Sequence, residues 1–151
     1  FYPNRKVVYK IRNQIGIKKD EKFILFFGQL DYMPNVQGIK IIINEIIPRL
    51  EKMNKKYKIV ICGKGDGKGL LKKFKHKNLI FEGFVNNIND YINACDVVIV
   101  PLVSGSGTRI KILEALACKK KVVSTSIGAE GIKKNKYLKI EDKMEKFVEK
   151  I

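Results

Sequence analysis

The sequence predicts an α/β protein of the Rossmann-like class, a parallel sheet with helices on both faces. Two apolar runs, residues 23–27 and 97–100, have the length of strands that are buried on both faces. Segments with apolar residues at helical spacing lie between such runs, and residues 36–53 are the longest of them. Strands that alternate with helices imply parallel pairing through right-handed crossovers.

The elements of the first half follow from apolar spacing and from turn residues. Residues 6–15 predict a short helix that ends at Gly16, since glycine is favoured just after a helix. A buried strand at 23–27 is followed by a loop at 28–35 and by the helix at 36–53. Pro48 predicts a kink or an early stop in that helix, because proline lacks the N–H that a helix requires.

The second half continues the alternation of strands and helices. Four further strands are predicted, at 57–62, 78–81, 96–100 and 121–124, and a short fifth one at 137–140. The helices expected between and after them are at 68–75, 87–95, 108–118 and 141–150. Ligands of such sheets bind beyond the carboxyl ends of the strands, which places a site among the loops at 28–35, 63–67, 82–86, 101–107 and 124–131.

The loop at 101–107 and the helix after it carry the most informative pattern. Small residues and glycines precede the helix, so free backbone N–H groups at its start favour a phosphate. Glu114 lies six residues into this helix, roughly 9 Å along its axis at 1.5 Å per residue. A diphosphate at the helix start and a sugar hydroxyl beside Glu114 would suit that distance. This pattern suggests a nucleotide-diphosphate site.

Composition limits the class of protein. The chain has 151 residues, enough for one domain with a core, and no apolar run long enough to span a membrane. Its net charge is +16, which is compatible with a lysine-rich solvated surface, with attraction to anionic lipid, or with nucleic-acid binding. Arginine is scarce and the lysines are scattered, so no nucleic-acid partner is expected.

Cysteine and histidine usage argues against a metal site. The three cysteines are widely separated, no Cys-x-x-Cys pair occurs, and the single histidine, His76, stands between lysines and is expected at the surface. The apolar surroundings of the cysteines predict reduced, buried thiols and a cytoplasmic location.

Several motifs together resemble family-4 glycosyltransferases of the GT-B fold. The specific part is the run 101–117, which reads Pro-Leu-Val-Ser-Gly-Ser-Gly-Thr-Arg-Ile-Lys-Ile-Leu-Glu-Ala-Leu-Ala, with the run 122–131 after it. Weaker support comes from 28–35, from Gly63-x-Gly65 and from Gly83-Phe84-Val85. The resemblance extends over nearly the whole chain from Arg12 onward.

The resemblance implies that residues 1–151 are the C-terminal, nucleotide-sugar-binding domain of such an enzyme. Residues 1–22 would be a helix and turn after an interdomain linker, and 141–151 a terminal helix. The N-terminal acceptor domain would be absent from this chain, which alone would be inactive. The implied reaction is retaining transfer of a sugar, of the hexosyltransferase type, from a nucleoside-diphosphate sugar to an acceptor hydroxyl. No cofactor and no bound metal are expected.

The resemblance also implies partners and a cellular setting. The partners would be the nucleotide sugar, the protein's own N-terminal domain and an acceptor glycan or lipid-linked glycan. A peripheral contact with an anionic membrane at the inner face would suit the basic charge. A nucleotide-binding regulatory domain without catalysis and a basic nucleic-acid-binding domain remain as alternatives. A receiver-type signalling domain of similar topology is a third, but the acidic phosphoacceptor pocket at the end of its first strand is not evident here.

The family pattern gives Glu114 and the preceding loop roles in donor binding. Glu114 resembles the glutamate that accepts hydrogen bonds from the donor ribose, although a surface pair with Lys111 is the simpler interpretation. Ser106 stands where many members have a second glutamate for the donor sugar, so Ser106, Gly107 and Thr108 are expected to bind the donor instead. Ser106 and Thr108 also suit helix N-capping.

The cations of the family's first loop are missing here. Gln29 follows Gly28 where many members have an arginine, and a second expected cation is absent as well. Arg109 is therefore predicted to neutralise the leaving diphosphate, with Lys111 or Lys64 assisting, so that Arg109 and Lys111 are the catalytic candidates.

The remaining donor-binding candidates come from the glycine loops. Gly28 and Gly63 should let the backbone approach the donor closely. Phe84 and Val85 occupy the stretch whose backbone reads the nucleobase in the family, while a core position for Phe84 is the alternative.

Overall fold

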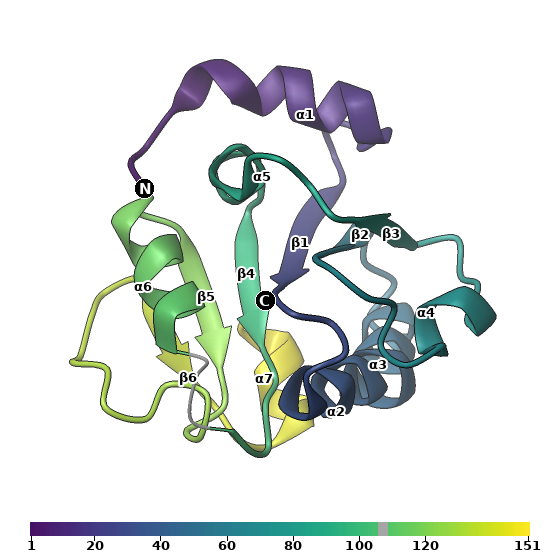
Figure 1. Ribbon diagram of the computed structural model, residues 1–151, viewed down its shortest axis with the longest axis vertical. Helices are drawn as coiled ribbons and strands as arrows, with labels where there is room; N and C mark the ends of the chain where they lie inside the picture. Colours follow the sequence, from purple (N-terminus) through teal and green to yellow (C-terminus); the bar gives the residue numbers. More distant parts are fainter. Residues whose placement is uncertain (106–108) are drawn as a thin grey trace.

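A single sheet of parallel strands organises the chain (Figure 1). The computed structural model describes residues 1–105 and 109–151, and within them the strand order is β3-β2-β1-β4-β5-β6. The strands are β1 Lys22–Phe27, β2 Tyr57–Cys62, β3 Leu79–Gly83, β4 Val97–Val100, β5 Lys121–Ser124 and β6 Leu138–Ile140. Every adjacent pair is parallel. The predicted α/β, Rossmann-like class is confirmed.

The helices form two groups on the two sides of the sheet. They are α1 Val8–Ile15, α2 Met33–Ile41, α3 Ile47–Lys52, α4 Leu70–Lys73, α5 Ile88–Ala94, α6 Arg109–Ala117 and α7 Met144–Glu149, with a 3-10 turn η1 at Arg5–Val7 and a π-helical segment η2 at Ile42–Ile46. Helix α1 packs against α5, and α7 packs against α3 and η2 (Figure 1). Right-handed crossovers place these groups on opposite faces, because the chain moves along the sheet in opposite directions from β1 and from β4.

The two central strands are the most deeply buried. All four residues of β4 and all of β1 after Lys22 are buried, as their continuous apolar sequence predicts for strands covered on both faces. The strand order changes direction between β1 and β4, so the loops after them diverge at the carboxyl edge of the sheet. Such a point is where ligands of open α/β sheets bind.

The long helix predicted at 36–53 begins earlier and does not stop at Pro48. Pro34 lies in the first turn of α2, a position that needs no N–H donor, so the helix starts at Met33. The helical path then continues through η2 into α3, and Pro48 lies in the first turn of α3. The wider π segment before Pro48 accommodates the missing N–H without ending the helix.

Two other predicted helices are shorter than expected. The helix predicted at 68–75 is reduced to α4, because Lys68 and Gly69 both have positive φ angles, 52° and 91°. The helix predicted at 141–150 begins only at Met144. Glu141 donates its N–H to the Ser124 carbonyl, and the Asp142 carboxylate accepts hydrogen bonds from Ser126, so both residues are committed to the loop after β5.

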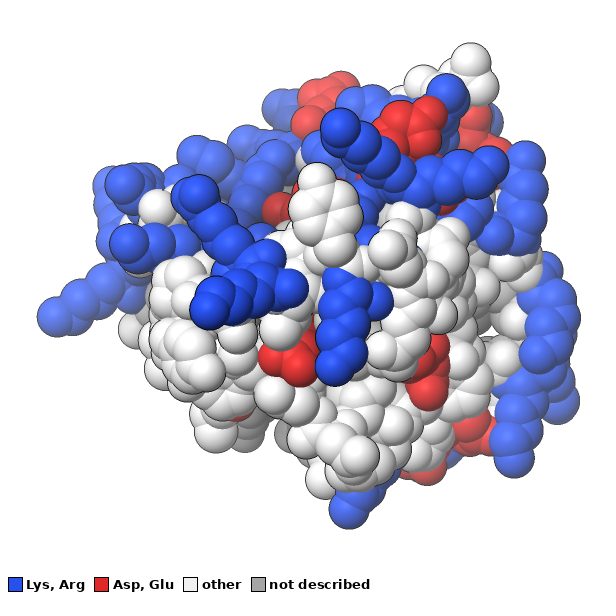
Figure 2. All heavy atoms as spheres, turned by 90° about the horizontal axis from the view of Figure 1, so that it is seen from above, with Lys and Arg blue, Asp and Glu red and all other residues white. Residues whose placement is uncertain are grey.

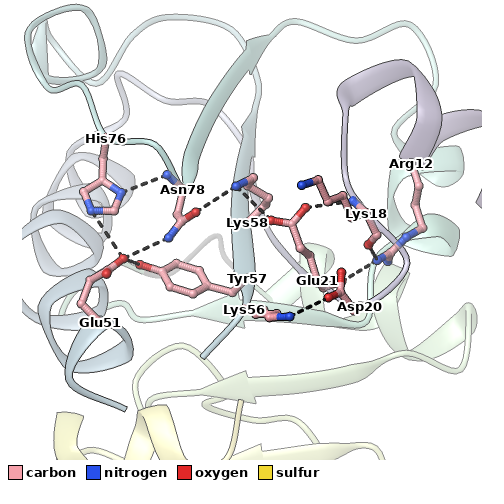
Figure 3. Close-up of polar contacts among 10 residues, drawn as sticks. All are labelled: Arg12, Lys18, Asp20, Glu21, Glu51, Lys56, Tyr57, Lys58, His76 and Asn78. Atoms are coloured by element: carbon pink, nitrogen blue, oxygen red, sulfur yellow. Dashed lines mark hydrogen bonds and ion pairs between the residues drawn. The ribbon is translucent and has the colours of Figure 1, made fainter. Parts of the chain in front are cut away.

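A network of polar side chains covers the amino edge of the sheet, away from the loops just described (Figure 3). The Tyr57 hydroxyl donates to Glu51 at 2.7 Å, and Lys58 pairs with Glu21 at 3.0 Å. The Arg12 guanidinium donates to two backbone carbonyls, those of Lys18 and Glu21. These contacts tie the starts of β1 and β2 to α1 and α3, and they leave the opposite edge free to form a site.

Basic side chains dominate the surface. Figure 2 shows Lys and Arg along the left, upper and right margins of one face and at its centre, with Asp and Glu scattered among them and mostly uncharged side chains in the lower part. The basic residues are thus spread around this face rather than gathered into one stripe, as the scattered lysines predict. Among the described residues, no helix has the length and apolar character that crossing a bilayer would need.

Candidate functional site

A pocket of about 400 Å³ opens at the carboxyl edge of the sheet, beyond β1, β2 and β3. It is lined by Phe27, Gly28, Gln29, Tyr32, Asn35, Cys62, Gly63, Lys64, Phe84, Val85, Ile88, Ile110, Lys111 and Glu114. The loops after the first three strands form one part of the wall, and α6 forms the other. The structure thus brings together residues that are up to 87 positions apart in the sequence, from Phe27 to Glu114.

The floor of the pocket is made by a close backbone contact between Gly28 and Gly63. Both glycines follow a strand directly and have positive φ angles, 149° and 145°. A Cβ at Gly63 would lie 1.8 Å from the Gly28 carbonyl oxygen, and Gly28 donates its N–H to the Cys62 carbonyl at 3.1 Å. No other residue fits at position 63, and both glycines line the pocket, while their close approach to a donor stays a prediction.

Lys111 reaches the pocket from the second residue after the start of α6. Its side chain is buried, and its Nζ donates to Asn35 Oδ1 at 2.9 Å. The ammonium also lies 4.9 Å from the centre of the Phe26 ring, on β1. Burial lowers the pKa of Lys111 to about 8, and the nearby Glu114 carboxylate acts in the opposite direction. The Lys111 Nζ lies next to Gly28, so its positive charge is at the pocket floor.

Glu114 lies one helical turn beyond Lys111 and lines the same pocket. Burial raises the pKa of this carboxyl, while the charge of Lys111 lowers it. The residue is half-buried, and among the described residues its carboxylate forms no ion pair within 4.0 Å. A simple surface pair with Lys111 is therefore not what the structure shows. A carboxylate so placed can accept hydrogen bonds from ligand hydroxyls.

Phe84 and Lys64 stand together at the pocket rim. The Lys64 Nζ lies 5.3 Å from the centre of the Phe84 ring, a cation–π contact. Phe84 is 62% exposed, so the alternative of a core aromatic does not hold for it. Val85, in contrast, packs against the core. The rim thus offers an aromatic face and a cation to a ligand.

Arg109 is not among the residues that line the pocket. Its guanidinium forms an ion pair with the Glu130 carboxylate at 3.2 Å and donates to the Glu130 carbonyl, in the loop after β5. The catalytic role expected for Arg109 stays a prediction. The other three donor-binding candidates of this loop, Ser106, Gly107 and Thr108, lie outside the described residues.

Asn35 is the functional candidate that the sequence alone did not single out. It is 3% exposed, and its amide contacts both Lys111 and the first loop. The only sequence signal was its place in the stretch 28–35, because a buried amide contact between distant segments leaves no local pattern. Other residues that line the pocket were also not singled out from the sequence: Tyr32, Cys62, Ile88 and Ile110. Burial raises the pKa of the Cys62 thiol, which keeps it uncharged.

Over the described ranges, 1–105 and 109–151, no group of three or more His, Cys, Asp or Glu residues could hold a metal ion. The charged groups that line the pocket are Lys64, Lys111 and Glu114.

Comparison with known proteins identifies the family. Residues 21–151 match the family model described as "Glycosyl transferases group 1". The chain belongs to this family. An uncharacterized glycosyltransferase of Methanocaldococcus jannaschii is 37% identical over 125 residues, which cover 78% of this chain and 30% of the relative. An uncharacterized 44.6 kDa protein from the cps region of Klebsiella pneumoniae is 32% identical over 119 residues, 72% of this chain and 30% of that protein. The chain thus spans under a third of the length of these two relatives.

Solved structures, one of them from a group 1 glycosyltransferase, have the same fold. HepE of Anabaena, solved with UDP and glucose, superposes with a TM-score of 0.76 at 19% identity, over 99% of this chain and 42% of HepE. The C-terminal domain of LpcC, a group 1 protein of Francisella tularensis, gives 0.70 at 23% identity, over 99% of this chain and 82% of that domain. The chain therefore has the fold of one half of a GT-B enzyme, as the motifs predict.

Proposed function

We propose that this chain is the donor-binding domain of a glycosyltransferase and binds a nucleoside-diphosphate sugar in the pocket at the carboxyl edge of the sheet. The observation that carries the proposal is that Lys111 and Glu114 lie one turn apart on α6 and line the same pocket, whose floor is glycine backbone. A cation and a carboxylate about 4.5 Å apart along the helix axis suit a ligand with phosphate at one point and hydroxyls at the next.

Each pocket residue has its own role in donor binding or in catalysis. The Lys111 ammonium attracts the diphosphate and stabilises the negative charge that grows on it as the sugar leaves. The Glu114 carboxylate accepts hydrogen bonds from the two ribose hydroxyls. Phe84 and Val85 border the base, and Gly28, Gln29, Gly63 and Lys64 surround the phosphates. In this scheme, protein cations rather than a metal ion stabilise the leaving group.

The transferred sugar goes to a hydroxyl of a glycan or lipid-linked glycan, with retention at the reacting carbon. This step needs the acceptor domain of the complete protein, since the chain spans only 30% of its relatives. The domain alone is expected to bind the donor without turnover. A cytoplasmic enzyme that touches an anionic membrane suits the net charge of +16. HepE, a protein of this fold, was solved with UDP-glucose, which supports a nucleotide sugar as the ligand.

A thermal-shift panel of nucleoside diphosphates and their sugars tests the proposal. One base should stabilise the domain, by about 2.7 kcal/mol when the ligand is at 100 times its Kd. The effect should vanish in Lys111→Met and persist in Lys133→Met, a matched change at an exposed lysine outside the pocket. If no nucleotide raises the melting temperature, the proposal is wrong. Donor binding without transfer by the complete protein would support the regulatory alternative.

A further inference from the structure

The Asn35 amide joins the two sides of the pocket. Asn35 lies in the first turn of α2, and its Nδ2 donates to the Gln29 carbonyl at 2.8 Å. Its Oδ1 accepts the hydrogen bond from Lys111 Nζ at 2.9 Å. The Asn35 side chain therefore holds both the loop after β1 and the ammonium of Lys111, which lies on α6.

The partners of the Lys111 ammonium are neutral. In the part of the chain that the structure describes, no carboxylate lies within 4.0 Å of its Nζ, and the rings of Phe26 and Phe27 are its other close neighbours. A buried lysine is normally paired with an acid, because an unpaired buried charge is costly. Here the positive charge is held in place but not neutralised, so it remains available to an anion in the pocket.

Arg109 is in the opposite situation. Its guanidinium already meets the carboxylate of Glu130 outside the pocket. An anionic ligand would have to compete with that carboxylate for Arg109, whereas Lys111 offers its charge to the ligand directly. This contrast distinguishes two cations that lie only two residues apart.

We propose that Asn35 is a positioning residue, which holds the Lys111 ammonium beneath Gly28 as the principal cation for the donor diphosphate, in place of Arg109. The inference rests on the proposed function, since the diphosphate is the ligand that it assigns to this pocket. It also goes beyond that function, because it names Lys111 on α6 as the cation that meets the diphosphate and Asn35 on α2 as the residue that positions it.

Few other titratable groups face this ammonium. Glu114 approaches from the same helix and favours the charged form of Lys111. Lys64 and Cys62 come from the end of β2 and the loop after it, and Tyr32 precedes α2. Lys64 is exposed at the rim beside Phe84. Asn35 alone among the pocket residues accepts a hydrogen bond from the ammonium, and such a bond favours the charged form of Lys111.

Two variants of Asn35 should move the titration of Lys111 in opposite directions. In Asn35→Leu the acceptor is lost, which disfavours the charged lysine and lowers its pKa. In Asn35→Asp a negative charge is added, which favours the charged lysine and raises its pKa. The titration is followed by NMR of isotope-labelled lysine in the free domain, with the Lys111 signal assigned by Lys111→Met. A role in folding alone would lower stability and leave the titration midpoint unmoved, which would overturn the proposal.

Calorimetry with UDP and uridine gives the second readout. For the wild type, UDP affinity should fall as pH rises from 7.5 through about 8 and above, where Lys111 loses its proton. Uridine affinity should stay constant. We expect at least a tenfold loss of UDP affinity in Lys111→Met, and in Asn35→Asp through neutralisation, with a smaller loss in Arg109→Gln. Circular dichroism verifies that each variant is folded.

The outcomes separate this inference from the proposed function. If the wild type binds neither UDP nor any other nucleoside diphosphate, the proposed function fails, while the NMR titration still decides whether Asn35 controls Lys111. If the wild type binds UDP, but Arg109→Gln loses more affinity than Lys111→Met, the proposed function stands and the assignment of the cation is wrong.

Discussion

The contact between Gly63 and Gly28 predicts a large effect from one added methyl group. In Gly63→Ala the new Cβ would lie 1.8 Å from the Gly28 carbonyl oxygen, far inside van der Waals contact. The φ angle of 145° at this position is also strained for any residue with a side chain. Backbone atoms of two strand ends cannot move apart without breaking the hydrogen bond from Gly28 to Cys62.

The expected loss of stability has two causes, the unfavourable φ angle and the steric overlap with the Gly28 carbonyl. A residue held in such a backbone region costs about 1–3 kcal/mol, and overpacking adds about 1–3 kcal/mol. Together they amount to roughly 2–6 kcal/mol, a large part of the roughly 5–15 kcal/mol by which domains are stable. Because the same contact forms the pocket floor, UDP affinity should fall with stability.

Urea denaturation at 25 °C, followed by circular dichroism, measures the difference in unfolding free energy. Gly16→Ala is the matched control. Gly16 also has a positive φ, 76°, but nothing lies within 4 Å of its added Cβ. The control carries only the backbone cost of about 1–2 kcal/mol. If Gly63→Ala were no less stable than Gly16→Ala, the argument from close approach would be refuted.

Three further predictions concern charged groups. The pKa of Lys111, about 8 in the folded chain against 10.5 for an exposed lysine, means that the unfolded chain binds more protons between these values. The free energy of unfolding of the wild type, measured relative to that of Lys111→Met, should therefore rise from pH 8 to pH 10.5, since groups common to both proteins cancel in the difference. By urea denaturation, Lys111→Met should be more stable than the wild type by about 3 kcal/mol at pH 7. Glu114→Gln should weaken UDP binding by about 1–3 kcal/mol in calorimetry, with no such change in Glu130→Gln and a smaller loss for a dideoxyribose analogue. Burial acts to raise the pKa of Glu21, but the Lys18 amide and Lys58 outweigh it, and the net shift is downward. Its stabilising effect should therefore be complete above pH 4.5 and disappear on acidification, so acid-unfolding curves of Glu21→Gln should be less steep than those of the wild type.

The fold was largely predictable because strands and helices leave local patterns. Apolar runs located the strands well, since a strand buried on both faces of a parallel sheet consists of nearly continuous apolar residues. Helix ends were harder to place. Positive φ angles at Lys68 and Gly69, and the side-chain contacts of Asp142, decide where α4 and α7 begin, and these depend on the folded chain.

The site was predictable only in part. The glycines and Phe84 could be placed at the carboxyl edge because their loops follow parallel strands, and Lys111 and Glu114 because their helix follows such a loop. The sequence could not show which of Arg109 and Lys111 faces the sheet, since that depends on how α6 is rotated against β5. It also could not show that Asn35 meets Lys111, because the two residues are 76 positions apart.

The many basic side chains, seen on one face in Figure 2, affect the rate at which anionic ligands arrive. A net charge of +16 draws a doubly negative nucleotide sugar towards the protein before any contact forms. This attraction speeds encounter and leaves departure almost unchanged. Because ions at physiological strength screen charges beyond about 8 Å, the association rate constant should drop steeply as salt is added. The salt concentration around the protein would then set how quickly this domain captures a nucleotide sugar.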